Sequence, residues 1–259
     1  MSSSKNYESK LVEELAEHIV SAGGCSAALT GAGISTPSGI PDFRSPGGLW
    51  SRIDPSIFDI STFHTRPDIT WINYAELVRE MRGKEPNPAH IALAQLEEMG
   101  LLEAVITQNI DGLHQKAGSR KVIELHGNAY RAVCMSCGSK YPIDEALAKV
   151  SEGRAPLCPK CGGLLKPDVV FFGEALPHRE FMTALSLAQR CRVFMSIGSS
   201  LVVQPAASLP LIAHESGAYV AIINLAETPL DSIADTVIRG RVEVILPELV
   251  NRVRLLLEG

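Results

Sequence analysis

Short apolar segments that alternate with amphipathic segments constrain the fold of this chain more than any other feature. The apolar segments have the length of buried strands and cover residues 25–30, 104–107, 122–125, 193–197 and 218–223. Helical periodicity covers residues from about 5 to 22, 71–82, 88–99, a segment after Pro205, and Pro247 to Glu258. Apolar strands that alternate with helices form mostly parallel sheets with both faces covered. We therefore predict an α/β fold of this kind.

Small and polar residues follow these strands at the points where the strands end. Because the carboxyl ends of parallel strands lie along one edge of a sheet and bind ligands there, we expect a single site at this edge. The segments that would meet there are the loop from Gly31, residues 107–114, residues 126–128, residues 198–200 and residues 224–225.

The loop after the first strand carries part of a phosphate-binding signature. Gly31 and Gly33 would let the backbone approach a pyrophosphate closely, with a helix N-terminus behind them. The ordinary dinucleotide fingerprint needs a third glycine, and Thr36 stands in its place. A tight structural turn explains the two glycines equally well. An acid, an aromatic ring and a guanidinium follow, which a plain turn does not need and which favour a nucleotide site: Asp42, Phe43 and Arg44.

Two Cys-x-x-Cys pairs predict a structural zinc site, made by Cys134, Cys137, Cys158 and Cys161. Each pair sets two thiolates on one side of a tight turn, and two pairs complete a tetrahedral shell of sulfur. A redox dithiol or free cysteines are the alternatives. Because sulfur fills all four positions, no position is left for water, and we expect the metal to stabilise structure without taking part in chemistry.

The same cysteines indicate how the chain is divided. Residues from about 130 to 166 interrupt the alternation of strands and helices, and we interpret them as a small inserted zinc-ribbon module. Residues 1–129 and 167–259 would then form the larger domain, and further helices of the small domain would come from about residues 45–100.

His126 is the strongest candidate for a general base, because it ends a strand and shares its edge with Asn109 and Asp111. A histidine that only caps a turn is the alternative, and His114 is a competitor that could instead face the helix beginning there. Asp111 could equally be a helix cap, and Asn109 a turn residue. Together with Gln108 they would suit a ligand that carries an amide. Ser199 and Ser200 would suit a phosphate or a ribose, or only a turn.

The composition argues against several functions. The 24 basic and 29 acidic residues include no Lys/Arg block, which disfavours direct nucleic-acid binding. No apolar run approaches the ~20 residues that span a bilayer, and the N-terminus has no signal-peptide core, so we expect a cytoplasmic protein. Cys25 and Cys191 lie in apolar segments and are expected to be buried thiols. A serine hydrolase is disfavoured because the Gly-x-Ser-x-Gly elbow is missing.

Several motifs, in order along the chain, closely resemble those of the sirtuins, which are NAD-dependent protein lysine deacylases. The resemblance extends from about Leu11 to Leu257. It rests on residues 31–35, 39–45, 107–114 and 126–128, the two cysteine pairs, residues 171–174 and residues 198–201. It implies a Rossmann-like domain and a small zinc domain, with NAD and an acetyl-lysine peptide meeting between them, and an enzyme that deacetylates lysine and consumes NAD. Protein mono-ADP-ribosyl transfer, or removal of longer neutral acyl groups, is the alternative.

The resemblance also implies roles for individual residues. His126 would be the general base, with Asn109 and Asp111 as further catalytic residues. The residues implied to bind NAD are Ala32, Thr36 and Arg44 at the diphosphate, Asp42 in the same loop, Phe43 over the reaction centre, Gln108 at the nicotinamide ribose, Asn109, Ile110 and Asp111 around the carboxamide, and Gly198, Ser199, Ser200, Asn224, Leu225 and Val242 at the adenosine half.

The acetylated partner is implied to bind as an extended strand between two segments of the chain. Its contacts would be Val170, Phe172, Gly173, Glu174 and Val202.

One departure from the sirtuin pattern concerns the acyl group. Sirtuins that prefer acidic acyl groups carry Tyr-x-x-Arg, whereas here Tyr74 is followed by Leu77 at the arginine position. Neutral acyl groups are therefore expected, because a buried carboxylate would lack a cation. We expect a monomer.

Overall fold

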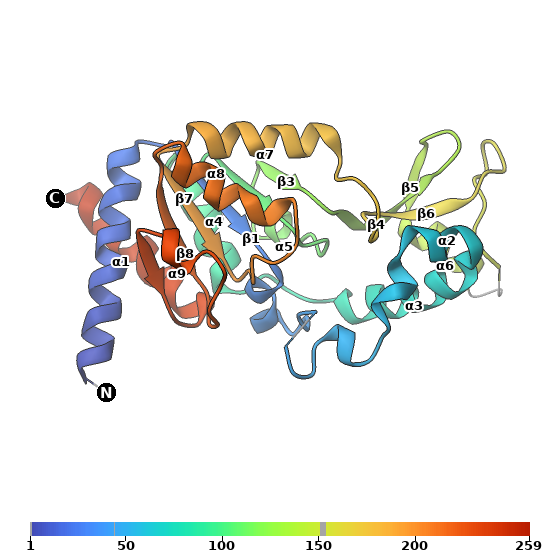
Figure 1. Ribbon diagram of the computed structural model, residues 1–259, viewed down its shortest axis with the longest axis horizontal. Coiled ribbons are helices and arrows are strands. Elements are labelled where there is room, and N and C mark those ends of the chain that lie inside the picture. Colours follow the sequence, from blue (N-terminus) through green and yellow to red (C-terminus); the bar gives the residue numbers. More distant parts are fainter. Residues whose placement is uncertain (1, 44, 151–153) are drawn as a thin grey trace.

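The larger part of the computed structural model is a parallel sheet in the strand order β3-β2-β1-β7-β8-β9 (Figure 1). The structure describes residues 2–43, 45–150 and 154–259. Every neighbouring pair in this sheet is parallel, which confirms the predicted α/β class. The strands are β1 (Ser26–Thr30), β2 (Ala104–Thr107), β3 (Val122–Glu124), β7 (Val193–Ile197), β8 (Tyr219–Ile223) and β9 (Thr236–Ile238).

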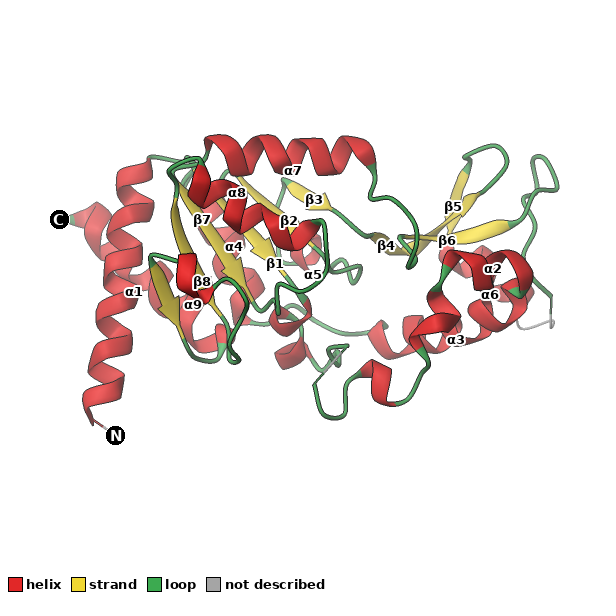
Figure 2. Cartoon of the chain, in the orientation of Figure 1, coloured by secondary structure: helices red, strands yellow, loops and turns green. Residues whose placement is uncertain are grey.

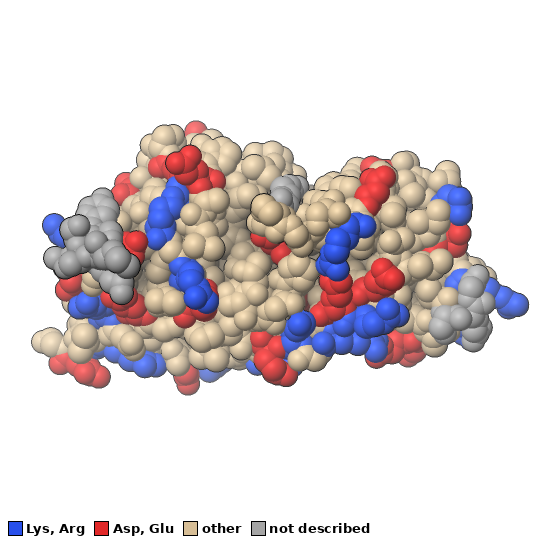
Figure 3. Space-filling model, turned by 90° about the horizontal axis from the view of Figure 1, so that it is seen from below, with Lys and Arg blue, Asp and Glu red and all other residues tan. Residues whose placement is uncertain are grey.

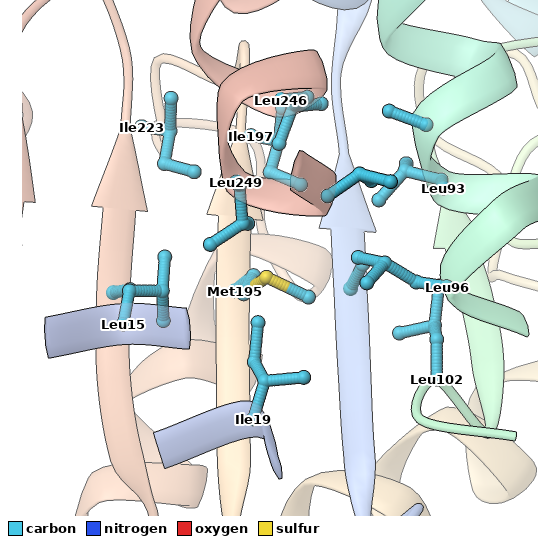
Figure 4. Packing of buried hydrophobic residues seen from close by; sticks show 14 of the residues in the cluster. Leu15, Ile19, Leu93, Leu96, Leu102, Met195, Ile197, Ile223, Leu246 and Leu249 are labelled. Carbon is cyan, nitrogen blue, oxygen red and sulfur yellow. The ribbon is translucent and has the colours of Figure 1, made fainter. Parts of the chain in front are cut away.

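Helices cover both faces of this sheet, as the apolar strands require. On one face, α1 (Ser2–Ala22), α4 (Pro88–Glu98) and α9 (Val242–Glu258) pack against the strands. Figure 4 shows the side chains that fill this layer, with Leu15 and Ile19 from α1 and Leu246 and Leu249 from α9 directed at Met195 of β7. On the other face lie α7 (His178–Arg190) and α8 (Leu209–Glu215), over a second apolar cluster.

A smaller part lies at the other end of the long axis and has its own apolar core (Figure 2). Its sheet is antiparallel, in the order β5-β4-β6. Helices α3 and α6 pack on each other and on β4. The elements of this part are α2 (Ile60–Thr65), α3 (Pro67–Met81), β4 (Gly127–Cys134), β5 (Lys140–Pro142), α6 (Ile143–Val150) and β6 (Leu165–Val169).

One of the connections between the two parts is the step from β3 to β4, which contains only Leu125 and His126. The carboxyl end of β3 is therefore also the entrance to the smaller sheet, and the segment after β6 returns to the larger part at α7 (Figure 1). This places the predicted site edge between the two cores.

The last helix differs from the prediction at its N-terminal end. It begins at Val242, and Pro247 lies inside it. Proline in a helix removes one backbone hydrogen bond, but the residues around it bury the apolar face of the helix: Leu246 and Leu249 are fully buried. Burial of that face outweighs the local preference of the proline.

Two further elements were not predicted with the correct bounds. Strand β9 has only three residues, too few for a periodicity to be recognised. After Pro205 the chain forms a short 3₁₀ turn, and α8 begins only at Leu209. Within the described residues, no helix combines the length and the apolar character needed to cross a membrane.

Candidate functional site

The glycine loop packs tightly against the end of β7. A Cβ atom on Gly33 would lie 2.8 Å from the Gly198 carbonyl oxygen, and one on Gly31 would lie 2.8 Å from the same atom. The Gly33 N–H donates to that oxygen at 2.8 Å, and the Gly31 N–H donates to Ile197 O at 3.1 Å. The two glycines therefore let two strand ends meet. Beyond them the chain continues as 3₁₀ turns, Ala32–Ile34 and Thr36–Ser38, and not as a long helix.

Ser35 joins the predicted carboxamide residues into one buried group. Its hydroxyl donates to Asp111 Oδ2 at 2.7 Å and accepts from Asn109 Nδ2 at 3.1 Å. Asn109 Nδ2 also donates to Gly31 O, so the amide is held between the loop and the serine. All three side chains are buried. Asn109 is thus more than a turn residue, and its amide and the Asp111 carboxylate have fixed directions.

Asp111 caps a short helix, which is one of the roles considered for it. Its Oδ1 accepts from the Leu113 N–H at 2.9 Å, at the start of α5 (Leu113–Lys116), while Oδ2 faces Ser35. Burial raises the pKa of Asp111, and the hydrogen bonds from Leu113 and Ser35 oppose that rise.

His90 is buried and contacts this group through Ser35. The Asn87 N–H donates to His90 Nδ1 at 3.3 Å, so the proton of neutral His90 is on Nε2, which lies 3.4 Å from Ser35 Oγ. Nothing in the spacing of the sequence pointed to Ser35 as the centre of this network. The capping box formed by Asn87 and His90 at the start of α4 is the signal that could have found His90.

His126 lies where the two sheets meet and is half-buried. Its Nδ1–H donates to the Gln108 carbonyl oxygen at 2.9 Å. Because a carbonyl can only accept, Nδ1 carries the proton of the neutral ring and Nε2 carries the lone pair. Burial lowers the pKa of His126, and the bond to Gln108 opposes that shift. The imidazole is therefore neutral near pH 7, which is the state a general base needs.

His114, the competitor, belongs to the core. Its Nε2 is 2.9 Å from Thr30 Oγ1, which donates to Thr107 Oγ1, and its ring packs 4.9 Å from the ring of His90. Burial lowers the pKa of His114 to about 3. A fully buried ring between two strand ends is unsuited to exchange protons with a ligand.

An aromatic cluster covers the loop at the end of the predicted nucleotide segment. Phe43 is half-buried and contacts Trp50, with ring centroids 5.2 Å apart, and Trp50 in turn contacts Phe172 at 6.0 Å. The Asp42 carboxylate accepts from the Ser45 N–H at 2.9 Å, which gives Asp42 a structural task in this turn. Arg44 lies outside the described residues.

The predicted adenosine residues follow neighbouring strands β7 and β8, which the pairing confirms to be adjacent. Ser199 is buried and accepts from Gln108 Nε2 at 2.9 Å, while Ser200 and Leu225 are exposed. The Asn224 amide donates to Ala226 O. Val242 is the first residue of α9 and is buried in the core, so its side chain packs against protein.

The remaining predicted NAD residues lie along the same edge. Ala32 and Ile110 are half-buried, Thr36 is exposed, and the Thr36 hydroxyl donates to Gly33 O at 3.0 Å. Figure 3 shows the surface hollowed between the two parts, with Lys and Arg side chains on that face interspersed with Asp and Glu.

The predicted peptide segment after β6 is tied to both parts of the molecule. The Val170 N–H donates to His126 O at 3.0 Å. Phe172 exchanges backbone hydrogen bonds with the smaller part, donating to Phe58 O at 2.9 Å and accepting from the Ile60 N–H at 3.0 Å. Its ring and the side chain of Val202 are exposed. The Glu174 carboxylate is engaged within the chain, on Lys166 and on the Phe171 N–H.

The four cysteines of the two pairs come together at one end of the smaller sheet. Their sulfur atoms all lie within 4.8 Å of one another, with 3.5 Å between Cys134 and Cys161 and 3.8 Å between Cys137 and Cys158. Tetrahedral zinc with bonds of about 2.3 Å places sulfurs about 3.8 Å apart. Each pair is followed by a glycine with positive φ, Gly138 and Gly162. The donor set and its spacing therefore fit a metal such as zinc.

Comparison with known proteins gives consistent matches. The Sir2 family model matches residues 31–205. An "NAD-dependent protein deacetylase 1" from Pyrobaculum aerophilum is 54% identical over 236 residues, which cover 91% of this chain and 92% of that protein.

Solved structures of Sir2 proteins are also similar to this chain. A Sir2 structure with a p53 peptide and NAD+ is 45% identical with a TM-score of 0.83, covering 89% of this chain and 93% of the other. Another, with a deacetylated p53 peptide and 3'-O-acetyl ADP ribose, is 46% identical with a TM-score of 0.83, covering 87% and 92%. With the family model matching most of its length and these relatives matching nearly all of it, the chain belongs to the Sir2 family.

Proposed function

We propose that this chain is an NAD-dependent protein lysine deacetylase with His126 as its general base. The observation that carries this proposal is the bond from His126 Nδ1 to the Gln108 carbonyl, which leaves Nε2 basic. Gln108 directly precedes Asn109, which forms a buried group with Ser35 and Asp111. Relatives named as NAD-dependent protein deacetylases, and Sir2 structures with peptide and NAD+, support the reaction class.

The residues at the sheet edge fit NAD as the second substrate. The side chains of Asn109 and Asp111 are buried and held in fixed directions, which suits recognition of the carboxamide. Gln108, whose amide donates to Ser199, would hold the nicotinamide ribose. Ala32 and Thr36 of the glycine loop would lie at the diphosphate, and Phe43 with Trp50 would cover the reaction centre.

NAD supplies a glycosidic bond to a cationic nicotinamide ring, which leaves as a neutral molecule. Holding the carboxamide and the ribose in an attack geometry would then provide much of the rate acceleration. As nicotinamide leaves, the acetyl oxygen would bond to the anomeric carbon and form an imidate. His126 Nε2 would accept the proton of a ribose hydroxyl, so that the sugar oxygen can attack the imidate carbon. Addition of water would then release the products free lysine and O-acetyl-ADP-ribose, in addition to the nicotinamide already formed.

The four cysteines are proposed to hold one structural zinc ion. The spacing of Cys134, Cys137, Cys158 and Cys161 supports a closed shell of four thiolates. Such an ion would fix the end of β4 and the loop before β6. It would take no part in acyl transfer, because no coordination position would remain for a ligand.

The acetylated protein is proposed to bind as an extended strand beside Val170, Phe172 and Gly173, with Val202 on the other side. The exposed Phe172 ring and Val202 side chain support this placement, as they are apolar groups at the edge of the site. Main-chain hydrogen bonds would provide most of the affinity, so the selectivity for peptide sequence would be weak.

Neutral acyl groups should be preferred over acidic ones. Leu77 is buried and apolar, and the Tyr74 hydroxyl donates to Ala129 O at 3.2 Å. A succinyl carboxylate placed beside Leu77 would meet no cation from this position, and an unpaired buried charge is costly. We expect acetyl-lysine turnover to exceed succinyl-lysine turnover by at least about tenfold. Parallel assays of the two peptides measure this ratio, and comparable rates would contradict the expectation.

Mass spectrometry of an acetyl-lysine peptide incubated with and without NAD tests the reaction itself. The expected result is loss of the acetyl group only when NAD is present, with formation of nicotinamide and acetylated ADP-ribose. Labelled NAD separates this reaction from mono-ADP-ribosyl transfer, in which the label would appear on protein instead. An unchanged peptide in the presence of NAD would contradict the proposal.

A further inference from the structure

A buried lysine at the start of β6 is the strongest unexplained charge in the described part of the chain. Lys166 is 7% exposed, and its ammonium group donates to Val169 O at 2.6 Å and Pro167 O at 3.2 Å. It also lies 4.4 Å from the centroid of the Phe171 ring. Burial lowers the pKa of Lys166, and the neighbouring carboxylate of Glu174 opposes that shift. A lysine is seldom buried unless it is paired.

The partner of Lys166 is Glu174, eight residues further along the chain. The distance from Nζ to Oε2 is 2.9 Å, and the same oxygen accepts from the Phe171 N–H at 2.8 Å. The Glu174 N–H donates in turn to Phe171 O, and Gly173 between them has a positive φ of 84°. The carboxylate therefore closes a tight turn and connects it to β6.

The same turn belongs to the segment that is proposed to bind the peptide. Val170 is bound to His126 O, and Phe172 is bound to Phe58 and Ile60 by its backbone. Backbone hydrogen bonds hold residues 170 and 172, and the bond from the Glu174 N–H to Phe171 O closes the turn. The Glu174 carboxylate adds the side-chain contacts at this end, to the Phe171 N–H and to Lys166. The ion pair is thus the side-chain contact that connects the far end of the segment to β6.

We propose that Lys166 is a positioning residue for the acetylated peptide, acting through Glu174 to hold the turn from Val170 to Glu174 in the shape that receives the peptide strand. This inference rests on the proposed function. Lys166 would not touch the peptide. Its role would be to order a surface turn before binding, so that the cost of ordering is not taken from the binding energy.

A contribution to the stability of the fold does not by itself explain why the ion pair of Lys166 and Glu174 is buried. Desolvating a lysine and a carboxylate offsets most of the attraction between them, and apolar residues often stabilise a core as well. The ion pair instead fixes the orientation of the Glu174 side chain and of the turn, because three acceptors and one aromatic ring surround the single ammonium group of Lys166.

Lys166→Met tests the proposal, because methionine keeps the length of the apolar stem and removes the charge. We expect the KM for the acetylated peptide to rise about tenfold, as for the loss of one charge-assisted contact. The kcat and the KM for NAD should change by less than about twofold, since the NAD residues lie on other strands. Lys166→Arg keeps a cation and should restore the peptide KM to within about threefold of the parent value.

Lys140→Met is the matched control. Lys140 pairs with Asp168 at 2.8 Å in the same small sheet, but its side chain is 56% exposed and the pair does not touch the peptide segment. We expect its kinetic constants to match those of the parent protein. Glu174→Gln is the second variant, for use if Lys166→Met fails to fold: glutamine can still accept from Phe171, and the peptide KM should rise about threefold.

The outcomes separate the two proposals. If the parent protein shows no NAD-dependent deacetylation, the proposed function is wrong. If the parent is active and Lys166→Met or Glu174→Gln lowers only the thermal stability, with an unchanged peptide KM, the positioning role is wrong. A peptide KM that rises equally in Lys140→Met would also overturn it.

Discussion

At the scale of single residues, a backbone carbonyl sets the chemical state of His126. The Gln108 oxygen fixes the proton on Nδ1 and thereby aims the lone pair of Nε2 away from the main chain. Gln108 itself is held by the bond from its amide to Ser199. Gln108, the residue proposed to hold the ribose, therefore connects the proposed base to the end of β7.

The two core histidines should make stability depend on pH. Burial lowers the pKa of His90 to about 4 and that of His114 to about 3, against about 6.5 in an unfolded chain. Their contribution is complete above the unfolded value and is lost as the pH falls towards the folded values. We expect the free energy of unfolding to fall by about 4 kcal/mol between pH 7 and pH 5.

Denaturant titrations at the two pH values measure this loss. The variant His114→Asn should reduce the pH dependence by about half, whereas the exposed control His178→Asn should leave it unchanged. An equal pH dependence in the parent and in His114→Asn would contradict the account of these residues.

At the scale of elements, the glycine loop packs closely against the end of β7, in addition to its proposed role in binding NAD. In Gly33→Ala, the new Cβ would lie 2.8 Å from Gly198 O and 2.9 Å from Gly198 Cα, both backbone atoms. We expect the variant to lose about 2 kcal/mol or more of stability and most of its affinity for NAD. Calorimetric NAD titration and thermal unfolding check both effects.

Gly23→Ala is the control for that substitution. Gly23 has a positive φ of 58°, unlike Gly33, and an added Cβ there would have no atom within 4 Å. It should cost only about 1 kcal/mol of backbone strain and leave NAD affinity intact. NAD binding by Gly33→Ala as tight as that of the parent would show that the close approach of the two loops is not required.

The cysteine turns should make the small sheet dependent on metal. We expect one zinc ion per chain in the purified protein, and about none in the Cys134→Ser/Cys161→Ser double variant, with Cys191→Ser as a control that keeps the ion. Native mass spectrometry counts the ion. Full deacetylase activity in a protein shown to contain no metal would contradict a structural role for it.

The elements also differ in how far they could be predicted. Strands β1, β2, β7 and β8 are continuous apolar runs and were recognisable, and so was the start of α4 at Pro88. Strand β9 is too short to show a period, and Pro247 was a misleading start signal because the buried face of α9 outweighs it. The pairing of Lys166 with Glu174 depends on a turn whose shape no spacing rule specifies.

At the scale of the whole molecule, His126 lies at the junction of two separately packed cores. Glu124 at the end of β3 pairs with Arg131 of β4, and Arg131 pairs with Asp168 of β6. A Cβ on Gly127 would collide with Asp168 O, so β4 and β6 approach closely where the smaller sheet begins. The proposed base, the proposed NAD edge and the proposed peptide segment therefore all lie where the two parts meet.

This arrangement explains which parts of the site were visible in the sequence. His126, Asn109 and Asp111 each follow a strand, so their convergence at one edge could be expected from a parallel sheet. Ser35 and His90 come from a loop and a helix start that meet only in the folded chain, and no local pattern connects them.

The most direct test of the central claim is the rate of O-acetyl-ADP-ribose formation by His126→Ala compared with the parent protein, together with calorimetric NAD binding by both. We predict a loss of at least about a hundredfold in rate, as expected when a general base is removed, with NAD affinity changed by less than about tenfold. The exposed variant His178→Ala should behave as the parent. A His126→Ala protein that binds NAD and forms the product at the parent rate would contradict the account.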